Sequence, residues 1–161
     1  MKKLYPLLSV LFLISIGNGQ KLYEVIETYE SGNIKSITYH KKIGVRIEKV
    51  KEEEYFENGR QRFLGRYKNG RREHGLWTKW YANGQKREET NYIDGKKDGL
   101  HTAWYANGQK DVEITYKDDK PVLDGLIIKW YENGQKHIER IYKDGEVISS
   151  KEWNKDGSVK E

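Results

Sequence analysis

Hydrophobic and polar residues alternate along much of this chain with the period of a β-strand. Residues 113–116 and 139–142 alternate as half-buried strands do, and residues 76–81 and 100–105 are rich in Trp, Tyr and Thr. A helical period is absent after residue 20. The pattern therefore predicts an all-β chain built from short strands.

The predicted strands are separated by a turn motif that recurs. The heptapeptide Trp-Tyr-Ala-Asn-Gly-Gln-Lys occupies residues 80–86 and 104–110, and residues 130–136 repeat it with Glu in place of Ala. Weaker copies lie at residues 29–32, 55–59 and 153–157. The turn glycines are 23 to 27 residues apart, at Gly32, Gly59, Gly84, Gly108, Gly134 and Gly157. A period of about 24 residues indicates a repeat protein.

Each period holds a second turn, eleven residues after the first glycine. It carries glycine at Gly70, Gly95 and Gly145, and Asp119 in the third full copy. Asn-Gly favours a type I′ hairpin turn, in which both central residues have positive φ. We therefore predict tandem antiparallel β-hairpins stacked into an elongated, solenoid-like ribbon. Its structural turns are expected at Gly59, Gly84, Gly95, Gly108, Gly134 and Gly145.

Alternation also assigns the aromatic residues to faces. Leu76, Thr78 and Trp80 are expected on one face of a strand, and Trp77, Lys79 and Tyr81 on the other. We expect one aromatic ladder to pack and the other to line a surface or groove, unless both are structural. The acidic run in residues 50–55 is interpreted as a charged connection or an edge strand.

Composition limits the chemistry. The chain has 161 residues, no Cys and a net charge of +5, which falls to about +3 without residues 1–19. The absence of Cys excludes disulfides, thiolate catalysis and thiol-ligated zinc. A small charge mixed evenly with acidic residues does not indicate nucleic-acid binding. Because aliphatic residues are few, order is expected to depend on Trp and Tyr.

The first 19 residues have the pattern of a secretory signal peptide. Lys2 and Lys3 precede an apolar run at residues 4–16, and Gly17 and Gly19 occupy the −3 and −1 positions of a cleavage site. The run is too short to span a membrane as a helix. We therefore expect export to the periplasm, cell surface or medium, with cleavage after Gly19; an uncleaved anchor is the alternative.

The repeats resemble a known family. Residues 75–84, 92–99 and their next two copies, extending to Gly145, are similar to the MORN repeat variant of bacteria (membrane occupation and recognition nexus). The resemblance implies a ribbon of hairpins that acts as an interaction module and not as an enzyme. Similar proteins are often labelled antitoxin components of toxin–antitoxin systems, a role that normally belongs in the cytoplasm. We divide the chain into a signal peptide (1–19), divergent strands or a cap (20–51) and a repeat array (52–161, clearest at 75–145).

Catalytic and metal-binding patterns are weak. His40, His74, His101 and His137 are scattered, without ligand spacing, so we expect no metal, no cofactor and no enzymatic activity. Two recurring sets, Glu89, Glu113, Glu139 and Lys86, Lys110, Lys136, are expected to form ion pairs across neighbouring strands; a paired-acid or calcium site is the alternative. Residues 154–157 are better read as a turn than as a calcium loop.

Two classes of function remain. The first is a scaffold that binds another protein through aromatic residues of the kind enriched in interface hot spots: Trp77, Trp80, Tyr81, Trp104, Tyr105, Trp130 and Tyr131. The second is a module that binds cell-envelope glycan by stacking sugars on the same ladder, with a lipid surface as a further possibility. Self-association through the ribbon ends is also expected to be open to this chain.

Overall fold

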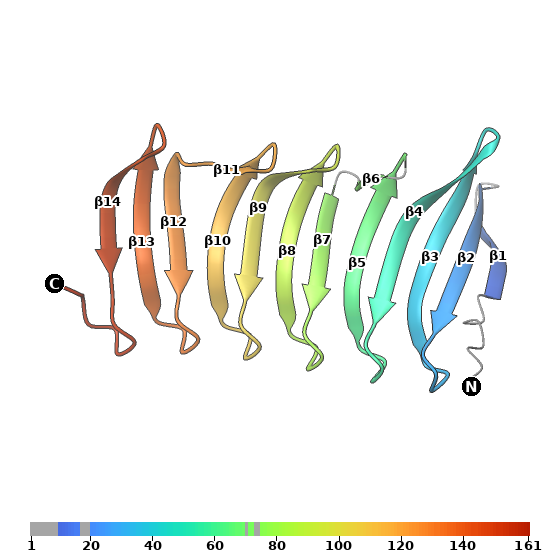
Figure 1. Cartoon of the computed structure of the whole chain (residues 1–161), viewed down its shortest axis with the longest axis horizontal. Helices are drawn as coiled ribbons and strands as arrows, with labels where there is room; N and C mark the ends of the chain where they lie inside the picture. Colours follow the sequence, from blue (N-terminus) through green and yellow to red (C-terminus); the bar gives the residue numbers. More distant parts are fainter. Residues whose placement is uncertain (1–9, 17–19, 70, 73–74) are drawn as a thin grey trace, which may run out of the picture.

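The computed structural model describes residues 10–16, 20–69, 71–72 and 75–161. They form one open antiparallel sheet in which twelve strands follow each other in chain order (Figure 1). The short strands β6 and β11 pair with the ends of β5 and β10. The strands are β1 (Val10–Ile16), β2 (Gln20–Thr28), β3 (Ile34–Ile43), β4 (Arg46–Tyr55), β5 (Gln61–Lys68), β6 (Arg71–Arg72), β7 (Gly75–Trp80), β8 (Lys86–Ile93), β9 (Lys96–Trp104), β10 (Lys110–Lys117), β11 (Lys120–Pro121), β12 (Gly125–Trp130), β13 (Lys136–Lys143) and β14 (Glu146–Glu152).

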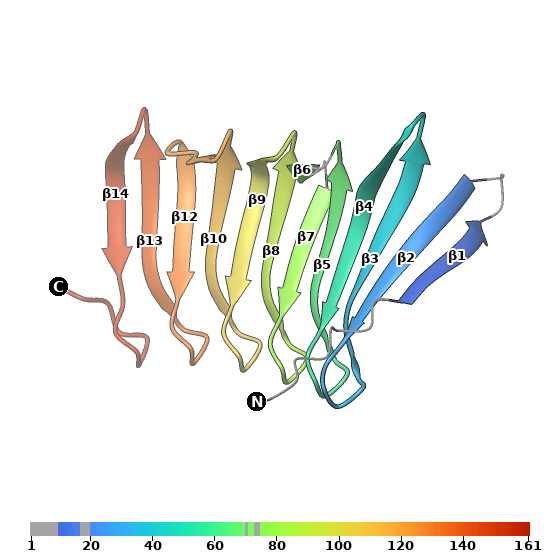
Figure 2. The ribbon, with the colours of Figure 1, turned by 45° about the vertical axis from the view of Figure 1, so that its right-hand side comes forward.

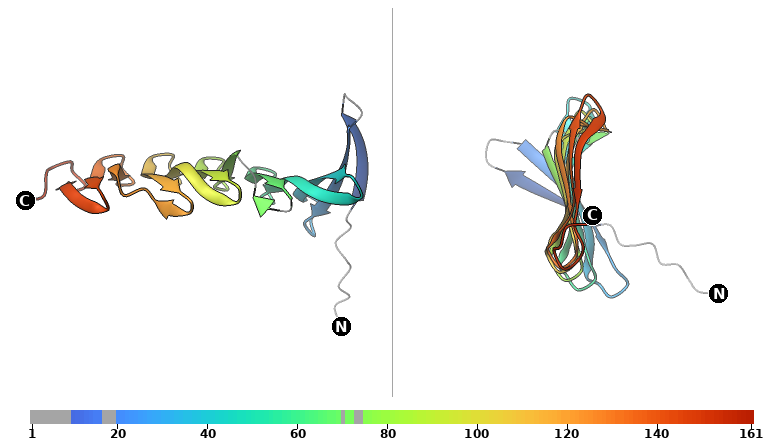
Figure 3. Two further views of the ribbon diagram at one scale, coloured as in Figure 1. Left: turned by 90° about the horizontal axis from the view of Figure 1, so that it is seen from above. Right: turned by 90° about the vertical axis from the view of Figure 1, so that its left-hand side faces the viewer.

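The sheet is a single layer that extends as a long ribbon (Figures 2 and 3). No helix occurs among the described residues, and so none there is long and apolar enough to cross a membrane. The predicted all-β ribbon of hairpins is confirmed. Its polar, aromatic-rich composition fits this shape, because no second layer covers either face of the sheet.

The predicted signal peptide falls partly outside the described residues. Residues 1–9 and 17–19, which include Gly19 and the basic start, are not described. Strand β1 comes from the apolar run and pairs with β2, from Val10↔Ile26 to Ile16↔Gln20. Gln20, the residue expected to begin the mature chain, is the first residue of β2.

The acidic run at residues 50–55 is neither a connection nor an edge strand, so that prediction is wrong. It belongs to β4, which pairs with β3 on one side and β5 on the other. Lysine pairing explains how the run tolerates an interior position: Lys51 Nζ lies 2.6 Å from Glu53 Oε1, and Lys49 Nζ lies 3.1 Å from Glu52 Oε2. Two of the three carboxylates in the run are thus neutralised by lysines on the same strand.

The Asn-Gly turns, at the lower end of the ribbon in Figure 1, are not of type I′. In the first clear copy φ is positive at Gly84 (91°) but not at Asn83. The Gly84 N–H donates to Tyr81 O (2.9 Å), and the Tyr81 N–H donates to Gln85 O (2.8 Å). This pattern is a type I turn followed by a left-handed glycine that forms a β-bulge. The prediction of a type I′ turn at these positions is therefore corrected.

Turns with two consecutive positive φ values do occur, but at the opposite, upper end of the ribbon. Asp94 (φ 49°) precedes Gly95 (86°), and Asp144 (52°) precedes Gly145 (86°). Asp118 and Asp119 adopt the same combination, with φ of 50° and 68°. The Asp-Gly turns thus have the φ signs of type I′, and Asp119 replaces the turn glycine without changing the sign of φ.

The asparagine of each lower turn connects successive repeats. Asn83 Nδ2 donates to Ala106 O (2.6 Å), and Asn107 Nδ2 donates to Glu132 O (2.6 Å). Tyrosine adds a second bond of the same kind, since the Tyr105 hydroxyl donates to Trp130 O (3.0 Å). These bonds link turns that are 22 to 26 residues apart in the chain. The turn motif therefore stabilises the stacking of hairpins as well as each hairpin.

Removal of one such hydroxyl tests this role. Tyr105→Phe is expected to lower the free energy of unfolding by about 0.5–1.5 kcal/mol, because the Trp130 carbonyl loses its donor. Urea denaturation followed by circular dichroism measures the loss. Tyr116→Phe is the matched control, since no hydrogen bond is made by the Tyr116 hydroxyl within the described part of the chain. Equal losses in the two variants would contradict the proposed ladder.

Two joints in the ribbon are shorter than the rest. β5 and β7, and likewise β10 and β12, are paired over two residues each: Phe63↔Lys79, Leu64↔Thr78, Val112↔Lys129 and Glu113↔Ile128. By contrast, β9 and β10 pair along their length, from Lys110↔Trp104 to Tyr116↔Gly99. In the described residues, the upper ends of β5 and β10 pair instead with β6 and β11.

Candidate binding groove

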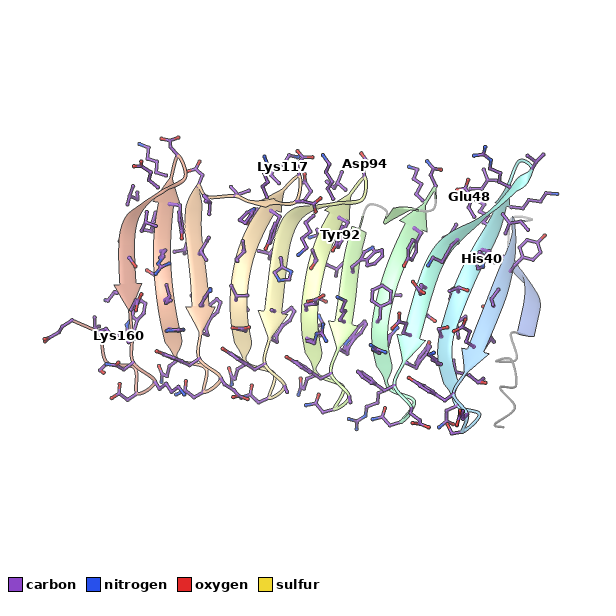
Figure 4. All side chains as sticks on the ribbon, viewed as in Figure 1. His40, Glu48, Tyr92, Asp94, Lys117 and Lys160 are labelled. Atoms are coloured by element: carbon purple, nitrogen blue, oxygen red, sulfur yellow. The ribbon has the colours of Figure 1, made fainter. Side chains whose placement is uncertain are left out.

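The best-packed part of the ribbon is an aromatic cluster on one face of β5, β7 and β8. We call this side the aromatic face. Trp77 is 7% exposed, and its ring centroid lies 5.1 Å from those of Phe63 and Tyr67 and 5.3 Å from that of Tyr92. Tyr92 lies near the upper end of β8, beside β7 (Figure 4). Tilted and edge-to-face pairs of this kind add stability beyond the area that they bury.

Gly65, in the middle of β5, provides room for this cluster. A Cβ atom built on Gly65 would lie 2.6 Å from Phe63 Cζ and 3.0 Å from Trp77 Cε2. Since real Cβ atoms do not approach so closely, both rings must lie over the bare backbone of Gly65. The glycine is needed here for space and not for positive φ.

Next to the cluster the aromatic face has a groove of about 470 Å³. Its lining combines aromatic rings with charged side chains: Glu52, Glu54, Phe56, Arg62, Phe63, Tyr67, Trp77, Lys79, Trp80, Arg87, Glu88, Thr90 and Tyr92. Except for Phe56, which directly follows β4, the residues come from β4, β5, β7 and β8, so the groove crosses the short β5–β7 joint. Its acidic and basic residues are equal in number, three of each.

The groove charges differ in how well they are paired. Lys79 Nζ lies 2.6 Å from Glu88 Oε1. Partial burial raises the pKa of Glu88, but the Lys79 ammonium outweighs it and holds this pKa below its usual value. Glu54 has a looser partner in Arg62, at 3.8 Å. Arg87 is exposed and makes no hydrogen bond or ion pair within the described residues. Glu54 and Arg87 are therefore the groove charges best placed to meet a ligand.

The opposite side, which we call the leucine face, carries a repeating unit of Lys, Glu and Trp. Lys110 Nζ lies 2.6 Å from Glu113 Oε2 and 5.5 Å from the ring centroid of Trp130. The lysines at 86 and 136 repeat this arrangement, with their glutamates at 2.7 and 2.5 Å and with Trp104 and Trp153. Each lysine thus lies over the tryptophan of the next repeat, a cation–π arrangement.

These ion pairs lie within one strand, and not across neighbouring strands as predicted. The β-bulge after each lower turn explains the difference. Trp104 pairs with Lys110 and Ala103 pairs with Val112, so Asp111 is an extra residue. The extra residue brings Lys110 to the same side of the strand as Glu113, three positions later. The alternative of a paired-acid or calcium site at Glu113 is not supported, because its carboxylate is bound to lysine.

The aromatic cluster does not extend along the ribbon. His101 and Ile127 occupy the positions that correspond to Trp77 in the next two repeats. His101 Nδ1 lies 2.7 Å from Thr90 Oγ1, and the His101 ring meets Tyr116 edge-on at 5.8 Å. Burial lowers the pKa of His101, and nearby Lys97 lowers it further. The groove therefore coincides with the one repeat that has Trp at this position.

The repeats now have a fold, a turn geometry and a periodic surface that can be compared with known proteins. Residues 73–94, 97–118 and 123–144 each match a family model. The model is that of the MORN repeat variant. The three matches cover β7, β8, β10, β12 and β13, and all of β9 except Lys96. No curated protein matches the chain.

The structure places the predicted aromatic residues in different surroundings. Trp77 is buried in the cluster, and only a small part of its ring faces the groove that it lines. The other six predicted residues are half-buried: Trp80, Tyr81, Trp104, Tyr105, Trp130 and Tyr131. Of these, Trp80 lines the groove. Trp104 and Trp130 are each covered by a lysine that lies two residues after the turn glycine of the preceding repeat. The corresponding residue for Trp80 is Gln61. Trp80 therefore lines the groove and has no lysine at this position.

No metal site is found in the described ranges, where no group of three or more His, Asp or Glu side chains could hold an ion. His74 lies outside the described residues. Asp156 Oδ1 accepts hydrogen bonds from the Ser158 N–H (2.9 Å) and hydroxyl (2.6 Å), as expected of a turn. Sequence reasoning did not single out Glu54, Arg62 or Arg87, which share the groove with the aromatic cluster.

A partly buried carboxylate near the groove predicts acid sensitivity. Glu53 accepts hydrogen bonds from Tyr39 (3.0 Å) and Tyr55 (2.9 Å) and pairs with Lys51. Burial raises the pKa of Glu53, but these three partners outweigh burial and hold it below its usual value. Burial, together with the hydrogen bond to the Glu53 carboxylate, raises the pKa of Tyr55 to about 12.

Because the folded pKa of Glu53 is depressed, its ionised form stabilises the fold above about pH 4.5, and this stability is lost as pH falls through the folded pKa. Glu53→Gln is therefore expected to flatten the fall in melting temperature below about pH 4.5. Thermal denaturation at a series of pH values measures the slope. Glu57→Gln, in an exposed turn, removes the same charge without these partners. A slope unchanged by Glu53→Gln would contradict the argument.

Proposed function

We propose that this chain is a non-catalytic, exported scaffold that binds another protein through the aromatic groove. The groove is the observation that carries the proposal. It combines rings of Phe, Tyr and Trp with arginine and with incompletely paired charges, a composition that is enriched at the centres of protein interfaces. MORN repeats are also known in protein-binding repeat modules, which supports the same function.

The glycan-binding alternative has weaker support. A sugar ring stacks on an exposed aromatic face, whereas lysine ammonium groups lie over Trp104, Trp130 and Trp153. Stacking on those rings would require displacing a cation that also pairs with glutamate. The antitoxin-like and lipid-surface alternatives have no specific feature of the MORN repeats in their favour.

Site-specific crosslinking tests the scaffold function. A photoreactive phenylalanine derivative at Arg87 is expected to crosslink the partner in cells that make the protein naturally, because Arg87 lies at the groove. The same group at Leu126 is the control, since Leu126 is 55% exposed but lies on the leucine face. Glu54→Lys should reduce the Arg87 adduct by reversing a charge on the opposite side of the groove. Equal adducts from Arg87 and Leu126 would count against the groove.

Export has its own test. N-terminal sequencing of the mature protein is expected to begin at Gln20, which would remove β1 and leave β2 as the first strand. Fractionation of the same cells should place this form outside the cytoplasm. A protein that is found in the cytoplasm and still carries residues 1–19 would contradict export, and would make a cytoplasmic antitoxin role the next hypothesis to test.

A further inference from the structure

A second hollow lies at the upper end of β3, β4 and β5, outside the segments that match MORN repeats. Its volume is about 540 Å³. It is lined by Leu22, Tyr39, Lys41, Ile43, Glu48, Val50, Lys51, Arg66, Tyr67 and Lys68. Four cations and one carboxylate give this lining a net charge of +3, whereas the lining of the aromatic groove is neutral. We call this hollow the basic groove.

Two of its cations are available for a ligand. Lys41 and Arg66 make no hydrogen bond or ion pair with any described residue. Lys51 is engaged with Glu53, at 2.6 Å. The single carboxylate, Glu48, lies on the upper part of β4 (Figure 4). Glu48 is paired with Lys41 in the register of β3 and β4, but no ion pair joins their side chains. An anion in the basic groove would therefore meet two cations that have no ion-pair partner among the described residues.

An apolar hairpin tip adjoins the basic groove. The β3–β4 hairpin exposes Ile43 (48%), Val45 (96%) and Ile47 (63%) at the upper end of the ribbon (Figure 1). Lys42 and Arg46 flank this tip in the sequence, and both are exposed. Exposed aliphatic side chains that are grouped in this way mark interaction surfaces. Ile43 belongs to both the tip and the groove lining, so the two features are continuous on that face, whereas Ile47, which is paired with Lys42, lies on the other face of the hairpin.

We infer that the basic groove and the hairpin tip together bind an acidic, partly apolar segment of a protein partner. The charge of the groove complements carboxylates, which would lie against Lys41 and Arg66. The aliphatic tip provides contacts for the apolar residues of the segment. The hollow shape favours a chain segment over a flat bilayer, because a segment can enter the hollow while a bilayer would meet chiefly the tip. This inference rests on the proposed function, because it takes the partner to be a protein.

A labelled peptide tests this directly. The probe is a fluorescein-labelled octapeptide, Asp-Glu-Val-Asp-Glu-Leu-Asp-Glu, and its control has every Asp and Glu replaced by Asn and Gln. Fluorescence anisotropy with the full chain is expected to show binding of the acidic peptide alone, weakening as salt rises. The double variant Lys41→Glu, Arg66→Glu should weaken binding roughly tenfold or more. Val45→Asp should also weaken it.

Matched controls separate a site from general attraction. Lys120→Glu with Lys143→Glu makes the same charge change at exposed upper positions far along the ribbon, and should leave peptide binding unchanged. Circular dichroism melting curves establish that each variant is folded. Equal weakening by the two double variants, or equal binding of the acidic and amide peptides, would overturn the inference.

The remaining outcomes also decide the matter. Sedimentation with vesicles of equal parts phosphatidylglycerol and phosphatidylcholine, abolished by Val45→Asp and accompanied by no peptide binding, would overturn the inference and assign the surface to a bilayer. Crosslinking from Arg87 reports on the aromatic groove independently. An Arg87 adduct without peptide binding would refute the basic groove alone, whereas peptide binding without an Arg87 adduct would refute the aromatic groove alone.

Discussion

Replacing Trp77 with alanine is expected to lower the free energy of unfolding by about 3–5 kcal/mol. The Trp77 ring is 7% exposed and contacts three other aromatic rings. Its removal leaves a cavity over Gly65 that a single-layer sheet cannot fill from a second layer. Urea denaturation, followed by far-ultraviolet circular dichroism, measures the loss.

Trp130→Ala is the matched control. Trp130 is half-buried, with the Lys110 ammonium 5.5 Å from its ring centroid, and it is not part of the aromatic cluster. Its backbone carbonyl still accepts the Tyr105 hydrogen bond after the substitution. We expect this variant to lose about half as much stability or less, by the smaller area that it buries. Equal losses would show that the cluster is no more important than any other tryptophan position.

The second large effect is expected at a lower turn in the middle of the ribbon. Gly108→Val should cost about 1–3 kcal/mol, because a β-branched residue is strained at the observed φ of 88°. A Cβ atom at this position would also lie 3.1 Å from Gln85 Oε1 of the preceding turn. The loss of stability is measured by thermal and urea denaturation.

The control for Gly108→Val is a substitution that adds a side chain but tolerates positive φ. Gly108→Asn adds a side chain that tolerates positive φ, so a smaller loss is expected than for valine. The Gln85 side chain can move away from either substituent, because its contacting atom is at its flexible end. If Asn and Val destabilise the chain equally, φ strain is not the reason that this turn needs glycine.

The ribbon could be predicted from the sequence because its determinants are local and repeated. Alternation fixes the strands, and the glycines at 84, 108 and 134 mark turns whose positions the structure confirms. The type of turn could not be predicted in the same way. Asn is compatible with positive φ, yet Asn83 uses its amide to bond Ala106 of the next repeat. That bond depends on the stacking of hairpins, which a pattern within one turn does not contain.

The degree of burial on each face and the groove could not be predicted for a related reason. Alternation placed Trp77 and Thr78 on opposite faces, which the register confirms, but both residues are buried, at 7% and 5% exposure. Their burial comes from the side chains of neighbouring strands, and alternation within one strand does not predict it. One signal in the sequence was informative, namely the replacement of Trp77 by His101 and Ile127 in later copies. The copy that carries Trp at this position is also the copy whose surface forms the aromatic groove.

The short β5–β7 and β10–β12 joints divide the ribbon into units that can open separately. Each joint has two paired residues on either side, so it costs less to break than pairing along a full strand. Pulled from its ends, the ribbon should yield first at these joints, in discrete steps and not in one event. Amides near the joints should exchange with solvent faster than those of β8 and β9. A partner bound across β5 and β7 would close one joint, and would therefore make the ribbon mechanically stiffer without any change of fold.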